Sequence, residues 1–298
     1  MFRDIVVAVT PSKVCECAAD KGIAFAQRFE ANLTLVHVCG VDQGWGEMEH
    51  LIPTGETVRI REQVEAHYAE KLKGVQKCEV HVVPGIPQNE ILRLARKKNA
   101  DLIIMGPHCK EYDDARSRTW GMAGSCLEKV SQRARCPVMI VSHDTPYGEQ
   151  AFFHILVATD FSPEVECAVA YGAQLARQYQ AQLHLFHALD IDALKERPKQ
   201  SEIEEHLRKI KDKMAEKYAK HLKGVTACSF EALEGGPATE ILKLARTIKA
   251  DLIVMAHHSK VDDPEEACLG STVARVALNS ICPTMSVNSH FDLRCALY

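Results

Sequence analysis

IVVA at residues 5–8 and ILVA at residues 155–158 are the two stretches that decide the fold. Each is short, apolar and rich in branched residues, which is typical of a parallel strand that is buried on both faces. The two lie 150 positions apart, and ADLI at 100–103 keeps the same spacing to ADLI at 250–253. A spacing that holds over about a hundred residues indicates that one domain has been duplicated.

The repeat also predicts the domain organisation. Domain 1 is expected over residues 1–146 and domain 2 over residues 147–298, and two domains suit a chain of 298 residues. The spacing has fallen to 146 by Cys136 and Cys282, so the first half carries four extra residues before that point. We expect these extra residues in a loop, because a strand or helix would not keep its register around them.

Strand and helix patterns alternate along each repeat. The stretches between the apolar runs have apolar positions at helical spacings of three and four. This βαβαβαβαβ order predicts an α/β fold, with a doubly wound parallel sheet and right-handed crossovers in each of two tandem domains. In the first half the predicted strands are residues 5–9, 33–38, 79–83, 102–105 and 138–141, and the second half repeats them.

Composition narrows the class of function. The chain is 46% hydrophobic and 26% charged, with a formal net charge of -4, which is ordinary for a globular protein and lacks the basic footprint of a nucleic-acid binder. It has neither ~20 consecutive apolar residues nor the pattern of a secretory leader, so we expect a cytoplasmic protein that does not enter membranes. In a reducing compartment its twelve cysteines are expected to be free, buried thiols.

Two loops in each half are candidates for a ligand site. In doubly wound sheets, ligands bind beyond the carboxyl ends of the strands, so the loops after the first and fourth strands face the site. Helices that begin at Gly124-Ser125 and at Gly270-Ser271-Thr272 follow the second of these loops. A glycine and a hydroxyl at a helix start offer free N–H groups to an anion, although a serine there is also an ordinary helix cap.

Three pairs of segments resemble the universal stress protein family. They are IVVAVTPS (5–12) and ILVATDFS (155–162) for its first strand, ADLIIMG (100–106) and ADLIVMA (250–256) for its fourth, and GSCLEKVSQRARCPVMIV (124–141) and GSTVARVALNSICPTMSV (270–287) for its last helix and strand. The resemblance implies an adenine-nucleotide alpha hydrolase-like fold with strand order 3-2-1-4-5. It also implies pairing through the last strands, so we expect a homodimer or internal pairing of the tandem domains.

The resemblance further implies an adenine nucleotide as ligand, which is ATP, ADP or AMP. ATP-binding members carry G-x2-G-x9-G-[ST] after the fourth strand, and neither half matches, because Cys109 and Ser259 stand at the second glycine. The family's opening aspartate, which contacts adenosine, is Asp160 in the second half and Thr10 in the first. The predicted binding residues are Asp160, Met255, Ala256, Gly270, Ser271 and Thr272 in the second half, and Thr10, Gly106, Gly124 and Ser125 in the first.

The loops after the fourth strands differ in charge. The first half carries cations that suit phosphate, whereas the second half carries carboxylates that disfavour a triphosphate nearby. We therefore expect a nucleotide with fewer phosphates in the second half. The cations are Lys110, Arg116 and Arg118, and the carboxylates are Asp262, Asp263, Glu265 and Glu266.

The leading interpretation is a non-enzymatic stress-response or signalling module with an unidentified protein partner. The sequence has no G-x-S-x-G, G-x4-G-K-[ST] or G-x-G-x-x-G motif, so no catalytic residue is assigned, while weak ATP hydrolysis stays open. One alternative is a partner-binding scaffold whose nucleotide sites have degenerated. The other is a thiol sensor that uses Cys109, Cys126 or Cys268, or a metal sensor that uses His257-His258.

Overall fold

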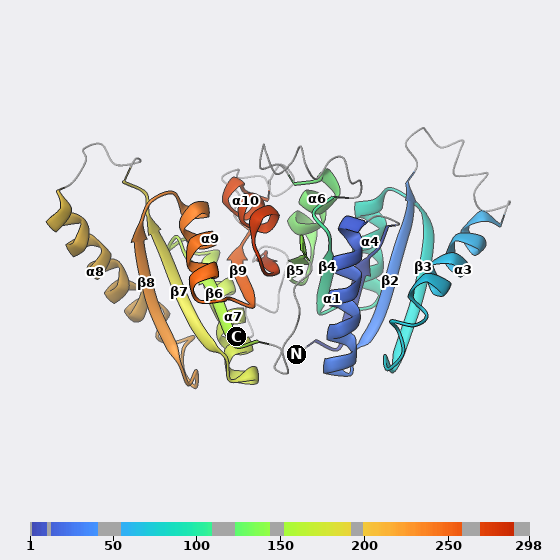
Figure 1. Ribbon diagram of the computed structural model, residues 1–298, viewed down its shortest axis with the longest axis horizontal. Helices are drawn as coiled ribbons and strands as arrows, with labels where there is room; N and C mark the ends of the chain where they lie inside the picture. Colours follow the sequence, from blue (N-terminus) through green and yellow to red (C-terminus); the bar gives the residue numbers. More distant parts are fainter. Residues whose placement is uncertain are drawn as a thin grey trace. The chain divides into compact units, whose positions relative to one another are not determined.

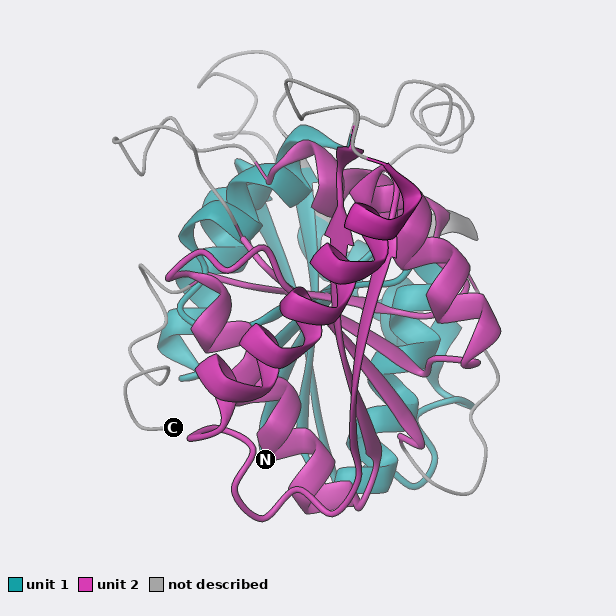
Figure 2. Cartoon of the chain, turned by 90° about the vertical axis from the view of Figure 1, so that its left-hand side faces the viewer, with its two compact units in different colours: residues 1–142 teal, residues 143–298 magenta. Residues whose placement is uncertain are grey.

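The computed structural model describes residues 2–10, 13–40, 55–108, 123–143, 152–191, 199–257 and 269–288. The chain divides into two compact units, residues 1–142 and 143–298, which Figure 2 colours separately. The predicted domain boundary between residues 146 and 147 lies outside the described residues and stays a prediction.

Unit 1 is an α/β domain with a parallel sheet. Its strand order is β3-β2-β1-β4-β5, which confirms the predicted order 3-2-1-4-5. The strands are β1 (Asp4–Ala8), β2 (Asn32–Gly40), β3 (Lys77–Gly85), β4 (Leu102–Met105) and β5 (Val138–Ile140). The helices are α1 (Lys13–Phe29), α3 (Glu56–Tyr68), α4 (Pro87–Lys97) and α6 (Ser125–Arg133).

Unit 2 repeats this architecture. Its strand order is β8-β7-β6-β9-β10, again with parallel pairing throughout the described strands. The strands are β6 (His154–Ala158), β7 (Gln182–Leu189), β8 (Cys228–Glu234), β9 (Leu252–Ala256) and β10 (Thr284–Val287). The helices are α7 (Val165–Tyr179), α8 (Gln200–Tyr218), α9 (Pro237–Thr247) and α10 (Ser271–Asn279).

Helices cover both faces of each sheet (Figure 1). The chain crosses the sheet in one direction before β3 and in the other direction after it. Right-handed crossovers therefore put α1 and α3 on one face of unit 1, and α4 and α6 on the opposite face. In agreement, α4 packs against α6, and α9 packs against α10 in unit 2. Because helices lie on both faces, the central strands are apolar at successive residues, and Val7 and Val157 are completely buried.

Two glycines at equivalent repeat positions bring the first helix of each unit close to its sheet. A Cβ atom on Gly22 of α1 would lie 2.3 Å from Cγ2 of Val7, and one on Gly172 of α7 would lie 2.4 Å from Cγ2 of Val157. Carbon atoms do not pack at such distances, so only glycine permits this approach. The contact fixes the helix against the strand whose carboxyl end carries the first candidate loop.

An aspartate before the fourth strand ties the amino end of each sheet together. Asp101 Oδ2 accepts hydrogen bonds from the backbone N–H groups of Arg3 and Asp4, at 2.9 and 3.1 Å. Asp251 Oδ2 accepts the two equivalent bonds in unit 2, at 2.7 and 2.8 Å. The repeated Ala-Asp-Leu-Ile segment therefore serves the packing of each sheet at the end opposite the candidate site.

The cysteines depart from the prediction at one position. Cys167, near the start of α7, is disulfide-bonded, so the expectation that all twelve cysteines are free thiols is wrong there. Spacing in the sequence does not reveal which cysteines the fold brings together. The other cysteines that the structure describes have no disulfide bond; they are Cys15, Cys17, Cys39, Cys78, Cys126, Cys136, Cys228 and Cys282.

Candidate ligand site at the carboxyl ends of the strands

The loops after the first and fourth strands of each unit lie at one edge of its sheet. β1 pairs with β4, and β6 pairs with β9, in parallel register. Thr10 and Gly106 therefore leave neighbouring strands of unit 1 at the same end, and Asp160 and Ala256 do so in unit 2. This is the edge at which doubly wound sheets bind ligands.

Asp160 presents a carboxylate at this edge of unit 2. It lies two residues after β6, its side chain is exposed, and its Oδ1 accepts the N–H of Ser162 at 2.9 Å. The hydroxyl oxygen of Ser162 is buried and has no hydrogen-bond partner among the described residues. A carboxylate and an unpaired hydroxyl thus lie two residues apart, and both can hydrogen-bond to a polar ligand.

Helix α10 begins at the same edge of unit 2. Its N-cap, Gly270, has φ 88° and ψ 134°, a conformation that suits glycine, and no described side chain caps the first turn. In that turn Ser271 is exposed and Thr272 is half-buried. Met255 and Ala256 are buried at the end of β9. The uncapped N–H groups and the positive end of the helix dipole favour an anion at this position.

The equivalent helix start in unit 1 is arranged differently. Gly124, the N-cap of α6, has φ -65° and ψ 142°, and its N–H donates to the carbonyl of Pro107 at 3.1 Å. Ser125 is exposed and Gly106 is buried. Thr10 stands where unit 2 has an aspartate. Unit 1 therefore has no carboxylate at this position, and its Gly124 N–H is already bonded to a carbonyl.

A half-buried histidine supports the first loop of each unit. Nδ1 of His37 lies 2.9 Å from the carbonyl of Val9, and Nδ1 of His187 lies 2.8 Å from the carbonyl of Thr159. A carbonyl only accepts, so Nδ1 carries the proton in both rings. Burial lowers the pKa of His187, although the bond to Thr159 acts in the opposite direction. Both rings therefore hold the first loop of their unit through a backbone carbonyl.

Sequence analysis missed a cluster around Phe161, which lies in the left-handed region with φ 64°. Its ring centroid lies 4.7 Å from that of His187 and 6.4 Å from that of Tyr218. From α8, Nζ of Lys213 lies 4.2 Å from the Phe161 centroid, and Nζ of Lys217 donates to the Phe161 carbonyl at 2.7 Å. The two lysines lie one helical turn apart, and this spacing is the signal that could have revealed the cluster.

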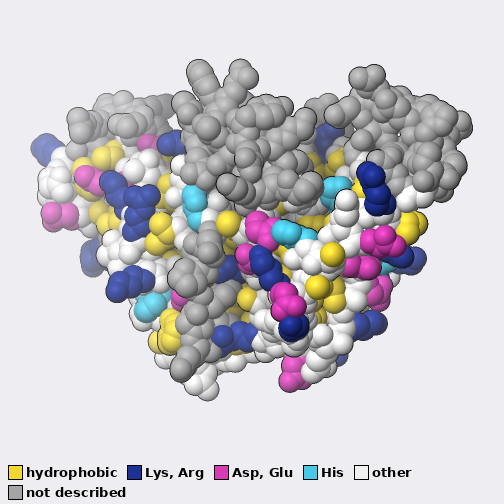
Figure 3. Space-filling view, turned by 45° about the vertical axis from the view of Figure 1, so that its right-hand side comes forward, with side chains coloured by type: hydrophobic (Ala, Val, Ile, Leu, Met, Phe, Trp, Pro, Cys, Tyr) yellow, Lys and Arg dark blue, Asp and Glu magenta, His cyan; other side chains and the backbone are white. Residues whose placement is uncertain are grey.

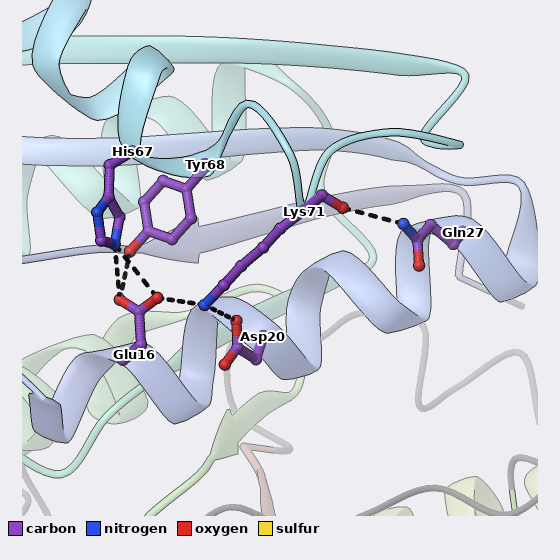
Figure 4. A network of polar contacts seen from close by, with 6 residues as sticks. All are labelled: Glu16, Asp20, Gln27, His67, Tyr68 and Lys71. Carbon is purple, nitrogen blue, oxygen red and sulfur yellow. Dashed lines mark hydrogen bonds and ion pairs between the residues drawn. The ribbon is translucent and has the colours of Figure 1, made fainter.

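In unit 1 a network of polar contacts fixes α3 against α1 (Figure 4). Glu16 of α1 accepts hydrogen bonds from Tyr68 Oη at 3.1 Å and from Lys71 Nζ at 2.5 Å, and it lies 3.3 Å from His67 Nε2. Lys71 also donates to Asp20 at 2.6 Å. Burial alone would raise the pKa of Glu16, but these contacts together hold that pKa below its ordinary value.

Of the residues named for a thiol or metal sensor and for the charged loops, most lie outside the part of the chain that the structure describes. Cys126 is half-buried in the first turn of α6. Among the described residues, no group of three or more His, Cys, Asp or Glu side chains is placed to hold a metal ion. The predicted residues that lie outside the described ones are Cys109, Lys110, Arg116, Arg118, His258, Ser259, Asp262, Asp263, Glu265, Glu266 and Cys268.

The described helices and the surface charge can be compared with the expectation that the chain binds neither membranes nor nucleic acid. Of the helices that the structure describes, none has the length and apolar character needed to cross a membrane. On the face drawn in Figure 3, basic and acidic side chains are intermixed. On that face the charges do not form the one-sign stripe that is typical of nucleic-acid binding.

Comparison with known proteins identifies the family. The model of the universal stress protein family matches the chain twice, over residues 1–142 and 151–288. A universal stress protein of Methanocaldococcus jannaschii is 32% identical over 149 residues, with 47% of this chain and 82% of that protein covered. One of Bacillus subtilis is 31% identical over 159 residues, with 47% of this chain and 99% of that protein covered. The crystal structure of a universal stress protein from Archaeoglobus fulgidus shares the fold, with a TM-score of 0.67 at 20% identity over 96% of each chain. The chain therefore belongs to the universal stress protein family, as a member with two tandem domains.

Proposed function

We propose that this chain is a non-enzymatic stress-response or signalling module of the cytoplasm, and that unit 2 binds an adenine nucleotide. In this proposal the nucleotide carries one or two phosphates, as AMP and ADP do. Binding would favour one conformation of a surface that an unidentified protein partner recognises.

One observation carries the proposal: a carboxylate and an uncapped helix start lie at the ends of two adjacent strands of unit 2. Asp160 follows β6, and α10 follows β9 with Gly270 at its N-cap. A carboxylate accepts hydrogen bonds from the hydroxyl groups of a ribose, and a helix N-terminus attracts a phosphate. The two ends of a small nucleotide therefore have complementary groups at this edge. Met255, Ala256, Ser271 and Thr272 complete the proposed set in unit 2.

For unit 1 we propose a weaker nucleotide site than in unit 2, or none. It lacks the carboxylate, and its Gly124 N–H is already bonded to Pro107. Thr10, Gly106 and Ser125 remain its proposed contacts, and we expect them to bind a nucleotide more weakly or not at all.

The test is to release and identify any nucleotide that accompanies the natively purified protein, by acid extraction, chromatography and mass spectrometry. The proposal expects an adenine nucleotide that Asp160→Ala loses and Thr10→Ala, the matched change in unit 1, retains. An empty extract, together with no thermal shift on addition of AMP, ADP or ATP, would reject nucleotide binding.

A partner-binding scaffold with degenerate nucleotide sites is the second candidate. The bond between Gly124 and Pro107 favours it, because it uses a group that a nucleotide site would leave free. In this candidate the chain acts through a homodimer or through pairing of its own two domains. Analytical ultracentrifugation separates these two assemblies, since only the homodimer doubles the mass of 33.1 kDa.

A further inference from the structure

A groove outside the candidate nucleotide site runs along the outer edge of the sheet in unit 1. Its volume is about 130 Å3. One wall comes from α3 and the other from β3, which is the outermost strand of this unit. It is lined by Thr57, Val58, Arg61, Val80, His81 and Val82.

No strand that the structure describes pairs with the outer side of β3. Its residues from Cys78 to Pro84 are half-buried rather than buried, and Val58 beside them is 48% exposed. An edge strand directs alternate N–H and C=O groups away from its sheet, and these groups are a template for another extended chain. The groove thus combines backbone hydrogen-bonding groups with apolar side chains.

Unit 2 has an ion pair at the equivalent repeat positions. Lys211 of α8 and Glu231 of β8 occupy the repeat positions of Arg61 and His81, and Lys211 Nζ lies 3.6 Å from a carboxylate oxygen of Glu231. Unit 1 has a cation in the helix position but a histidine in place of the glutamate. The repeat itself therefore shows which charge is missing from the groove of unit 1: a carboxylate opposite Arg61.

The neighbouring charges do not supply this carboxylate. Glu79 accepts a bond from Lys98 at 2.5 Å, lies 3.8 Å from Lys77 and is 3.2 Å from His81. The bond from Lys98 is the main reason that the pKa of Glu79 falls to about 2.

Arg61 itself has only a weak partner on its own helix. Arg61 and Glu65 are 3.6 Å apart, and both are 51% exposed, so water screens the pair. The printed ion pairs beside the groove join three cations, Arg61, Lys77 and Lys98, to two carboxylates, Glu65 and Glu79. The groove therefore favours an acidic occupant.

We propose that this groove binds an extended, acidic peptide segment of a partner protein. The segment pairs with the β3 edge as an additional strand, its apolar side chains contact Val58, Val80 and Val82, and its carboxylate lies opposite Arg61. The position of this carboxylate corresponds to that of Glu231 in unit 2. The proposal does not depend on nucleotide binding.

The test uses the full chain and three fluorescein-labelled peptides. The first is acetyl-Thr-Val-Glu-Val-Glu-Val-Thr-amide, the second has lysine in place of glutamate, and the third has proline in place of the central valine. Fluorescence anisotropy gives the affinities, and hydrogen exchange locates the bound peptide. We expect the acidic peptide to bind at least about fivefold more tightly than either control, and to slow exchange in β3 but not in β8.

Variants then identify the side chains. Arg61→Glu removes the cation, and His81→Glu installs the acidic residue of unit 2 beside Arg61. Each is expected to weaken binding of the acidic peptide by about fivefold, whereas Arg59→Glu, the same charge change on the same helix, leaves it within about twofold.

Four results would overturn the proposal. They are no binding of the acidic peptide at millimolar concentration, equal binding of the three peptides, equal effects of Arg61→Glu and Arg59→Glu, and protection of β3 that rises with protein concentration alone. The last result would assign the edge to a second copy of the chain.

Discussion

Unit 1 and unit 2 end their central strands at equivalent places, but they carry different chemistry there. Neither helix start has a side-chain cap among the described residues, but unit 2 has Asp160, whereas unit 1 has Thr10 and a Gly124 N–H that is bonded to Pro107. The outer edges differ as well, since an ion pair spans α8 and β8 in unit 2 but not the equivalent positions in unit 1. The candidate ligand positions and the outer edges therefore differ between the repeats.

The packing positions have not diverged. Gly22 and Gly172 make the same close approach to the first strand, and Asp101 and Asp251 bond the same two backbone groups. The comparison indicates that the duplicated fold constrains its core and its amino edge more strongly than its carboxyl edge. The following predictions test this contrast, from the largest expected effect to the smallest.

Gly172→Ala is expected to destabilise unit 2 by about 1–3 kcal/mol, because the new Cβ meets Val157. Gly22→Ala is expected to do the same in unit 1. Gly236→Ala is the control, since nothing lies within 4 Å of a Cβ there. Hydrogen exchange reports each unit separately, which matters because two domains need not unfold together. Equal effects of Gly172→Ala and Gly236→Ala would contradict the shared packing.

Asp251→Ala is expected to cost about 1–2 kcal/mol, since it removes two hydrogen bonds to backbone N–H groups. Asp101→Ala is expected to give a similar loss in unit 1. Urea denaturation measures both, with Asp212→Ala on the exposed side of α8 as the control. A large loss in one unit and none in the other would show that the amino edges have diverged too.

Glu16→Gln is expected to reduce stability by only about 0.5–1 kcal/mol at neutral pH, because the carboxylate is half-buried and the water that reaches it screens its contacts. The folded-state pKa lies below the ordinary value of 4.5, so this stability is present above pH 4.5 and is lost as pH falls through the folded-state pKa. Thermal unfolding between pH 3 and pH 7 measures it, with Glu62→Gln as the control. A difference from wild type that persists unchanged at pH 3 would contradict the assignment.

Cys78 and Cys228 are expected to react slowly with iodoacetamide at pH 8. Burial raises the pKa of each thiol to about 11, so little thiolate is present. Mass spectrometry of the native and unfolded protein measures the rates. Rapid labelling of both native thiols would contradict the raised pKa values and the burial that causes them.

Much of the fold could be predicted from the sequence, and for identifiable reasons. The two parallel α/β units follow from the apolar runs and the repeat spacing, whereas the strand order follows from the resemblance to the universal stress protein family. The edge that carries the candidate site follows from the same topology.

The remaining features depend on contacts between distant residues. The bond from Gly124 to Pro107, the position of Lys213 over Phe161 and the pair of Lys211 with Glu231 each join separate elements. Among them, only the one-turn spacing of Lys213 and Lys217 gives a local signal, and that signal does not identify Phe161 as the partner. The disulfide at Cys167 is a further case, since only the fold decides which thiols meet.

Isothermal titration of the full chain with AMP and ADP tests the difference between the two units most directly. The account predicts one site per chain, abolished or weakened at least about tenfold by Asp160→Ala and unchanged by Thr10→Ala. Two equal sites, or a single site that survives Asp160→Ala, would contradict it.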